Sequence, residues 1–160
     1  MSGKISDNLG RAAGLVKATS VSGGKVLQVV GATCATEASH TSTSYTDSGL
    51  DVDITPTAST SKILISATMN ISYLAGKTHY LTIFRDSTDL SDDDAQGMLQ
   101  VTSTTGGHKV SATFLYLDSP ESTSALTYSI YGKAAVSGDT IKMCSGDAAG
   151  QITAFEIDGS

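Results

Sequence analysis

Hydrophobic and polar residues alternate in several short segments of this 160-residue chain. The clearest alternation runs from Ile63 to Ile71, where every second residue is isoleucine, alanine or methionine. Since successive side chains of a strand point to opposite faces of a sheet, this pattern predicts a strand with one buried face. The segment from Leu50 to Ile54 alternates in the same way. It sets Asp51 and Asp53 on one face, as expected for the solvent side of an edge strand.

Further segments with strand-like patterns follow at regular spacing, and no segment shows a convincing helical period. They are Val26–Val30, Thr78–Asp86, Met98–Thr102, Val110–Leu117, Leu126–Tyr131, Ile141–Met143 and Ile152–Ile157. In Val110–Leu117 both alternating sets are largely apolar, so we expect both faces of that strand to be covered. About eight to ten short strands separated by turn residues predict an all-β fold. We expect a jelly-roll-like antiparallel β-sandwich, with a barrel as the main rival.

The first 24 residues have a different pattern. Glycines interrupt them and no period of 2 or 3.6 is sustained, which predicts an extended N-terminal arm over residues 1–24 and a sandwich domain over residues 25–160. Four basic residues and one acidic residue lie between Met1 and Lys25, whereas the rest of the chain has six basic and fifteen acidic residues. A basic arm on an acidic body can dock on an acidic partner, although a solvated tail remains the alternative. The predicted partner-binding residues are Lys4, Ile5, Leu9, Arg11, Leu15, Val16 and Lys17.

Composition narrows the possible partners. A net charge of −6 and a pI near 4.8 argue against binding to nucleic acid or to an anionic membrane surface. Hydrophobic residues make up 39% of the chain and tryptophan is absent, so the core is thin and an oligomer is favoured. No apolar stretch near Met1 has the length of a signal peptide, so we expect synthesis in a cytoplasm without an export signal.

The two cysteines, Cys34 and Cys144, lie far apart and lack the paired spacing of a zinc site. In a reducing compartment we expect them to be buried, unbonded thiols, with a disulfide between them as the alternative.

Candidate chemistry is sparse. The acidic segment with Asp86, Asp89, Asp92, Asp93 and Asp94 lacks the spacing of an EF-hand, which favours a solvated loop over a Ca²⁺ site. His40, His79 and His108 are scattered, and no hydrolase, phosphate-binding or metalloprotease motif is present. Glu121 and Glu156 are isolated, so they form no predicted acid–base pair. We therefore predict no catalytic, cofactor-binding or metal-binding residues and no enzymatic activity.

Six tyrosines offer aromatic surface of the kind that stacks on sugars. Most of them fall at core or edge positions of the predicted strands, so a structural role is favoured over a sugar platform. They are Tyr45, Tyr73, Tyr80, Tyr116, Tyr128 and Tyr131.

Four blocks of sequence carry a resemblance to a known family: GKVLQVVGAT (24–33), TSYTDSGL (43–50), VDITPTASTSKILI (52–65) and ITAFEI (152–157). They resemble a recurrent β domain of virion surface proteins from tailed bacteriophages, which occurs in tail-fibre-like and head-decoration-like proteins. The likeness extends from Lys25 to Ile157 and is most specific in the third block. It implies a virion location and a homotrimer, and it supplies no catalytic residues.

The chain has no shaft repeats and no large second domain, unlike long fibres. A short arm plus one domain is what a capsid decoration (cement) protein or a short head fibre needs, with the arm bound to the major capsid protein or to another virion protein. The alternative is a tail-fibre or receptor-binding component that recognises a host surface glycan. A soluble hydrolase is the least favoured hypothesis.

Overall fold

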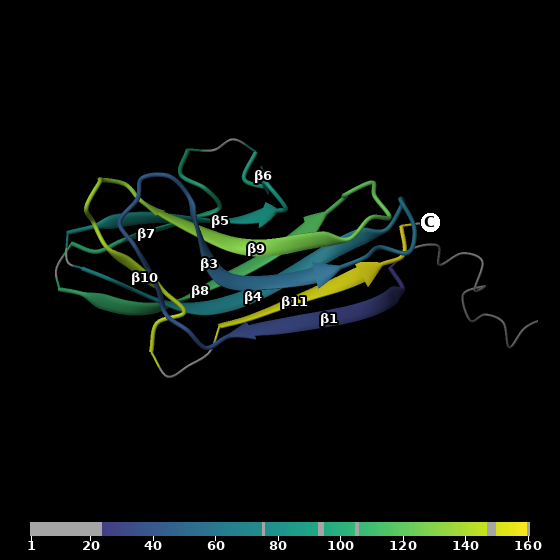
Figure 1. Cartoon of the computed structure of the whole chain (residues 1–160), viewed down its shortest axis with the longest axis horizontal. Helices are drawn as coiled ribbons and strands as arrows, with labels where there is room; N and C mark the ends of the chain where they lie inside the picture. The colour runs from purple at the N-terminus through teal and green to yellow at the C-terminus, as the bar shows by residue number, and fades with distance from the viewer. Residues whose placement is uncertain (1–23, 75, 93–94, 105, 147–149, 160) are drawn as a thin grey trace, which may run out of the picture.

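A computed structural model describes residues 24–74, 76–92, 95–104, 106–146 and 150–159 of the chain. These residues form eleven strands and no helix, arranged as two antiparallel sheets that pack face to face (Figure 1). The prediction of an all-β antiparallel sandwich is therefore confirmed, while the jelly-roll connectivity stays a prediction. The predicted arm, residues 1–24, lies outside the described residues except for Gly24.

The larger sheet, here called sheet A, is built around β4. One edge of β4 pairs along its whole length with β8, while the other edge pairs first with β11 and then with β10. β1 pairs with β11, and β2 pairs with β10. The strand bounds are β1 Val26–Cys34, β2 Ala38–His40, β4 Lys62–Tyr73, β8 His108–Asp118, β10 Ile141–Met143 and β11 Gly150–Ile157.

The smaller sheet, sheet B, has the order β3-β9-β5-β6, and β7 extends it beside β5. Within the described residues β3 pairs only with β9, so the predicted edge strand with Asp51 and Asp53 on its exposed face is confirmed. The strand bounds are β3 Thr46–Ile54, β5 Thr78–Arg85, β6 Thr88–Asp89, β7 Leu99–Thr102 and β9 Leu126–Ala134.

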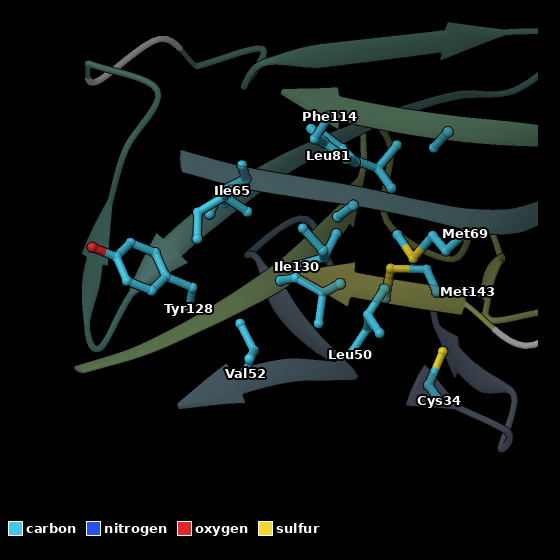
Figure 2. Packing of buried hydrophobic residues seen from close by; sticks show 14 of the residues in the cluster. Cys34, Leu50, Val52, Ile65, Met69, Leu81, Phe114, Tyr128, Ile130 and Met143 are labelled. Carbon is cyan, nitrogen blue, oxygen red and sulfur yellow. The ribbon is translucent and has the colours of Figure 1, made fainter. Parts of the chain in front are cut away.

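The core lies between the two sheets, as Figure 2 shows for side chains from both of them. Ile65 and Met69 of β4 are almost completely buried, as predicted from their alternation, and so are Leu81 of β5 and Ile130 of β9. Tyr128 is also fully buried between the sheets. In β3 and β4 nearly every second side chain enters this core, as the hydrophobic period of 2 predicts, whereas β5 and β9 each bury three consecutive residues.

A disulfide between Cys34 and Cys144 ties the end of β1 to the residue after β10, with 6.3 Å between their Cα atoms. The prediction of unbonded thiols is therefore wrong, and the alternative is the one observed. Both cysteines are buried, and Cys34 pairs across the sheet with Gly150. A Cβ atom on Gly150 would lie 2.7 Å from the Cys34 Sγ, so glycine is needed beside the disulfide. We call this part of the sandwich the disulfide end.

The opposite end of the sandwich is held by two buried carboxylates, and we call it the carboxylate end. Glu156 of β11 accepts hydrogen bonds from the amide and hydroxyl of Thr57 (2.6 and 2.7 Å) and from the hydroxyl of Ser61 (2.7 Å). Its second oxygen accepts one from the Gln28 side chain at 2.7 Å. Burial alone would raise the pKa of Glu156, but these hydrogen bonds outweigh it and lower the pKa to about 2.

The second carboxylate, Asp118 of β8, joins the two sheets. It accepts two hydrogen bonds from the Arg85 guanidinium, at 2.7 and 3.0 Å, and one from the Tyr128 hydroxyl at 2.7 Å. Arg85 and Tyr128 belong to sheet B, so this cluster bridges the sandwich. Burial first, and then the hydrogen bond to Asp118, raise the pKa of Tyr128. The cluster therefore keeps a phenol, a carboxylate and a guanidinium in one bonded group.

Candidate interaction surfaces

The predicted partner-binding residues of the arm, from Lys4 to Lys17, lie outside the described residues, so their role stays a prediction. The structure does define the point from which the arm departs. The amide of Gly24 donates to the carbonyl of Asp158 at 3.1 Å, and the amide of Asp158 donates to the carbonyl of Lys25 at 2.8 Å. These two bonds continue the β1–β11 pairing, so residue 24 is fixed at the carboxylate end beside the last strand (Figure 1).

The outer face of sheet A carries a row of apolar side chains that crosses four strands. Val29 of β1 lies opposite Phe155 of β11, Phe155 opposite Leu64 of β4, and Leu64 opposite Leu117 of β8. Val29 is 54% exposed and Leu117 is 55% exposed, while the two central residues are half-buried. Leu115, two residues before Leu117 on the same face, is 73% exposed. We call these five residues the apolar row.

The expectation that both faces of Val110–Leu117 are covered is wrong for the outer face. Phe114 and Ala112 are buried against the core, but Leu115 and Leu117 project away from it. Within the described residues β8 pairs only with β4, so its other edge borders a groove of about 380 Å³. Met98 and Leu99 line the opposite wall, and Phe114, Leu115 and Tyr116 belong to the wall formed by β8. The apolar row and this groove share Leu115 and form one continuous surface.

The outer face of sheet B has the opposite character. Asp47, Asp51 and Asp53 are exposed along β3. Burial, and then the neighbouring charges of Asp47 and Asp53, raise the pKa of Asp51. Tyr131 lies opposite Asp47 across the β3–β9 pairing, and its ring centroid is 4.2 Å from that of Phe84. Acidic and aromatic side chains are therefore neighbours on this face.

The burial of the six tyrosines agrees with the structural role that the sequence predicts for most of them. Tyr73 and Tyr128 are buried, whereas Tyr80, Tyr116 and Tyr131 are half-buried on strands. Tyr45 contacts the Phe84 ring edge-on, and the ammonium of Lys133 lies 4.2 Å from its ring centroid. Packing thus accounts for most of the tyrosines, and Tyr131 lies opposite the exposed carboxylate of Asp47.

The acidic segment after β5 is organised by its own carboxylates. Asp89 accepts hydrogen bonds from the Thr82 hydroxyl at 2.7 Å and from the amide of Ser91 at 3.0 Å. Asp86 accepts from the amide of Thr127 at 2.9 Å. Asp93 and Asp94 lie outside the described residues. Among the residues described, no group of three or more His, Cys, Asp or Glu side chains is placed to hold a metal ion.

Two of the three histidines, His79 and His108, contact the same tyrosine ring. His40 is half-buried, and its Nε2 lies 2.9 Å from the carbonyl oxygen of Asp47. His79 is completely buried at the disulfide end, with its ring centroid 5.6 Å from that of Tyr73. His108, at the start of β8, packs beside the same tyrosine, with 6.4 Å between the two ring centroids. Burial lowers the pKa of His79 and Lys77 adds to this effect, although the nearby Asp139 opposes it.

A hollow at the disulfide end contains a further polar cluster that the sequence did not predict. The Glu37 carboxylate accepts hydrogen bonds from the Lys142 ammonium and the Ser145 hydroxyl, both at 2.8 Å. These two bonds lower the pKa of Glu37. The pairing of β2 with β10 brings Glu37 next to Lys142 and Ser145, which are more than 100 positions away. The sequence alone contains no signal for this contact.

No known protein family matches the chain, and no characterised protein sequence matches it. The part of the chain that the structure describes contains no apolar helix of membrane-spanning length.

The apolar row is the surface that sequence reasoning missed. Its signal was present, because Leu115 and Leu117 break the polar side of an otherwise regular alternation. The sequence could not show that leucines of β8 share a row with Val29 and Phe155, since that depends on strand order and register.

Proposed function

We propose that this protein is a non-catalytic structural component of the virion of a tailed phage. It acts as a homotrimeric capsid decoration (cement) protein or a short head fibre, and its N-terminal arm docks on the major capsid protein or another virion protein. The observation that carries the proposal is the separation of basic and acidic residues. A basic segment precedes a fixed point at Gly24, while three exposed carboxylates line β3 on the outer face of sheet B.

The described geometry supports a structural role. The sandwich is closed by a disulfide, by the Glu156 cluster and by the bridge from Asp118 to Arg85. The buried carboxylates Glu156 and Asp118 serve as cross-links between segments and between sheets, which suits a particle component that must persist outside the cell.

Binding to undecorated phage particles tests the docking role of the arm. The full chain is compared with K4E/K17E in the arm and with K109E/K142E on the body, which changes the charge by the same amount. We expect the arm variant to lose occupancy on particles by about tenfold or more, because it reverses the charge that faces an acidic partner. The body variant keeps its occupancy. Equal occupancy of all three proteins, measured by electron microscopy and pelleting, would overturn the docking role.

The neighbouring Tyr131, Phe84 and Asp47 favour a second candidate, a tail-fibre or receptor-binding component for a host surface glycan. Aromatic rings and carboxylates together suit sugar recognition, since the ring stacks on the apolar sugar face and the carboxylate accepts hydroxyl hydrogen bonds. Glycan-array binding that is lost in Tyr131→Ala, together with antibody labelling of the tail, would favour this candidate over the decoration protein.

A further inference from the structure

We infer that the apolar row and the adjoining groove form the surface on which a second copy of this chain packs. This inference deepens the proposed function and rests on its homo-oligomer. It identifies the contact surface as Val29, Leu64, Leu115, Leu117 and Phe155, with Met98 and Leu99 across the groove.

The extent of the row is the first argument. Four strands spaced about 4.8 Å apart make the row roughly 15–20 Å wide, and the groove continues it around the β8 edge. Three of its side chains are more than half exposed although they are valine or leucine. Contiguous apolar surface of this kind on a soluble domain marks a place where another molecule packs.

The distribution of charge favours a second copy as that molecule. Among the outward-facing strand residues of sheet A, the charged ones are Lys62, Lys109 and Lys142. The exposed carboxylates of β3 lie on the other sheet. Two acidic copies that met through sheet B would oppose Asp47, Asp51 and Asp53, whereas the four strands that carry the apolar row present no exposed carboxylate on that face.

The edge strand gives the third argument. From Val110 to Leu117 β8 contains no charged residue and no proline, although its outer edge is unpaired within the described residues. Soluble proteins usually protect such edges with charges, proline or a covering segment. A second copy that packs over Leu115 covers this edge and the groove together.

The size of the surface determines how tightly we expect two copies to associate. The row and groove have a flat footprint on the order of 400 Å², about half of what each partner buries in a standard stable interface. We therefore expect association that depends on concentration and includes residues flanking the row.

Sedimentation velocity of the purified full chain in the absence of particles tests the inference. The key variant is L115E/L117E, and the control is L74E/V136E, which places the same charges on leucine and valine residues of 59% and 62% exposure outside the row. We expect the wild type and the control to oligomerise. In the row variant the dissociation constant should rise by at least about a hundredfold, because two charges become buried in the contact. Circular dichroism checks that each variant is folded, and L115S provides a milder change at the same site.

Three outcomes overturn the inference. One is a monomeric wild type at the highest accessible concentration. Another is an unchanged oligomer in the row variant. The third is a monomeric full chain that oligomerises only after residues 1–24 are removed, which would assign the row to the arm. None of these outcomes bears on particle binding by the arm, so the proposed docking is tested separately.

Discussion

The two ends of the sandwich are closed by different chemistry. A covalent bond between Cys34 and Cys144 holds the disulfide end, whereas Glu156 and Asp118 hold the carboxylate end through hydrogen bonds. Both devices join segments that are distant in sequence, and both lie where strands give way to loops. The difference means that reductant should open the disulfide end, whereas protonation of Glu156 should weaken the carboxylate end.

Removal of the disulfide is expected to have the largest effect. The bond closes a loop with a sequence separation of 110, and cross-links of about that span restrict the unfolded chain by about 4–5 kcal/mol. The C34A/C144A variant should therefore lose roughly that amount of unfolding free energy in urea, with a further contribution from lost packing. Hydrogen exchange should increase first near Cys34 and Gly150.

Reductant supplies the matched control. It should lower the stability of the wild type toward that of C34A/C144A and leave the variant unchanged. A wild type that loses less than about 1 kcal/mol on reduction would contradict the prediction that the bond closes this end.

Substitution of Glu156 by Gln is expected to have an intermediate effect. The variant keeps an oxygen for Thr57 and Ser61 but turns an NH₂ group toward the Gln28 amide, which also donates to the carbonyl of Thr55 at 2.8 Å. A buried hydrogen bond replaced by facing donors costs about 1–3 kcal/mol. Chemical unfolding at pH 7 measures the loss. The exposed Glu121→Gln should change stability by less than about 0.5 kcal/mol.

The stability difference between the wild type and E156Q should also depend on pH. The folded pKa of Glu156, about 2, is below its ordinary value of 4.5, so the unfolded state binds more protons between these limits. The contribution of ionised Glu156 to the free energy of unfolding is complete above pH 4.5 and is lost as the pH falls toward 2. The difference between wild type and E156Q should shrink over that window, and a constant difference would argue against an ionised Glu156.

His79 is expected to give the smallest effect, at the disulfide end. Its folded pKa is lowered, mainly by burial, so its neutral form stabilises the fold above the ordinary value of 6.5, and this contribution is lost as the pH falls below 6.5. His79→Phe fills similar space and should change stability by less than about 1.5 kcal/mol at pH 7.5. It should also remove the decline in stability that begins below pH 6.5. Urea titrations at several pH values, with His40→Gln as the control that keeps the decline, test this prediction.

The strands with apolar alternation could be predicted from the sequence, because one-sided burial imposes a period of 2. Ile141–Met143 has the predicted bounds. The observed bounds of β4 and β5 differ from their own predicted bounds by at most two residues. Ala38–His40 and Thr88–Asp89 were missed, since each is short and is defined by pairing with a neighbour rather than by buried apolar side chains. The segment after Gly31 was also missed, and β1 continues to Cys34 because β11 pairs with it throughout.

The contacts that close the molecule could not be predicted, for a related reason. Glu156 looked isolated because its donors Thr57 and Ser61 lie nearly 100 residues earlier in the sequence. A reducing compartment predicts thiols for the two cysteines, and spacing alone carries no information on a pair 110 residues apart. Register across β1, β11, β4 and β8 likewise created the apolar row from residues that are scattered in the sequence.

The pairing of β1 with β11 also determines when the fold can be completed during synthesis. Val29 has no sheet partner until Phe155 has been made, and at about 5–20 residues per second this delay lasts on the order of ten seconds. Such non-local pairing is typical of slow folding. Phe155 belongs to β11, so the apolar row is complete only once synthesis has passed that strand. Two copies can therefore meet through this row only after β11 of each has been made and has paired with β1.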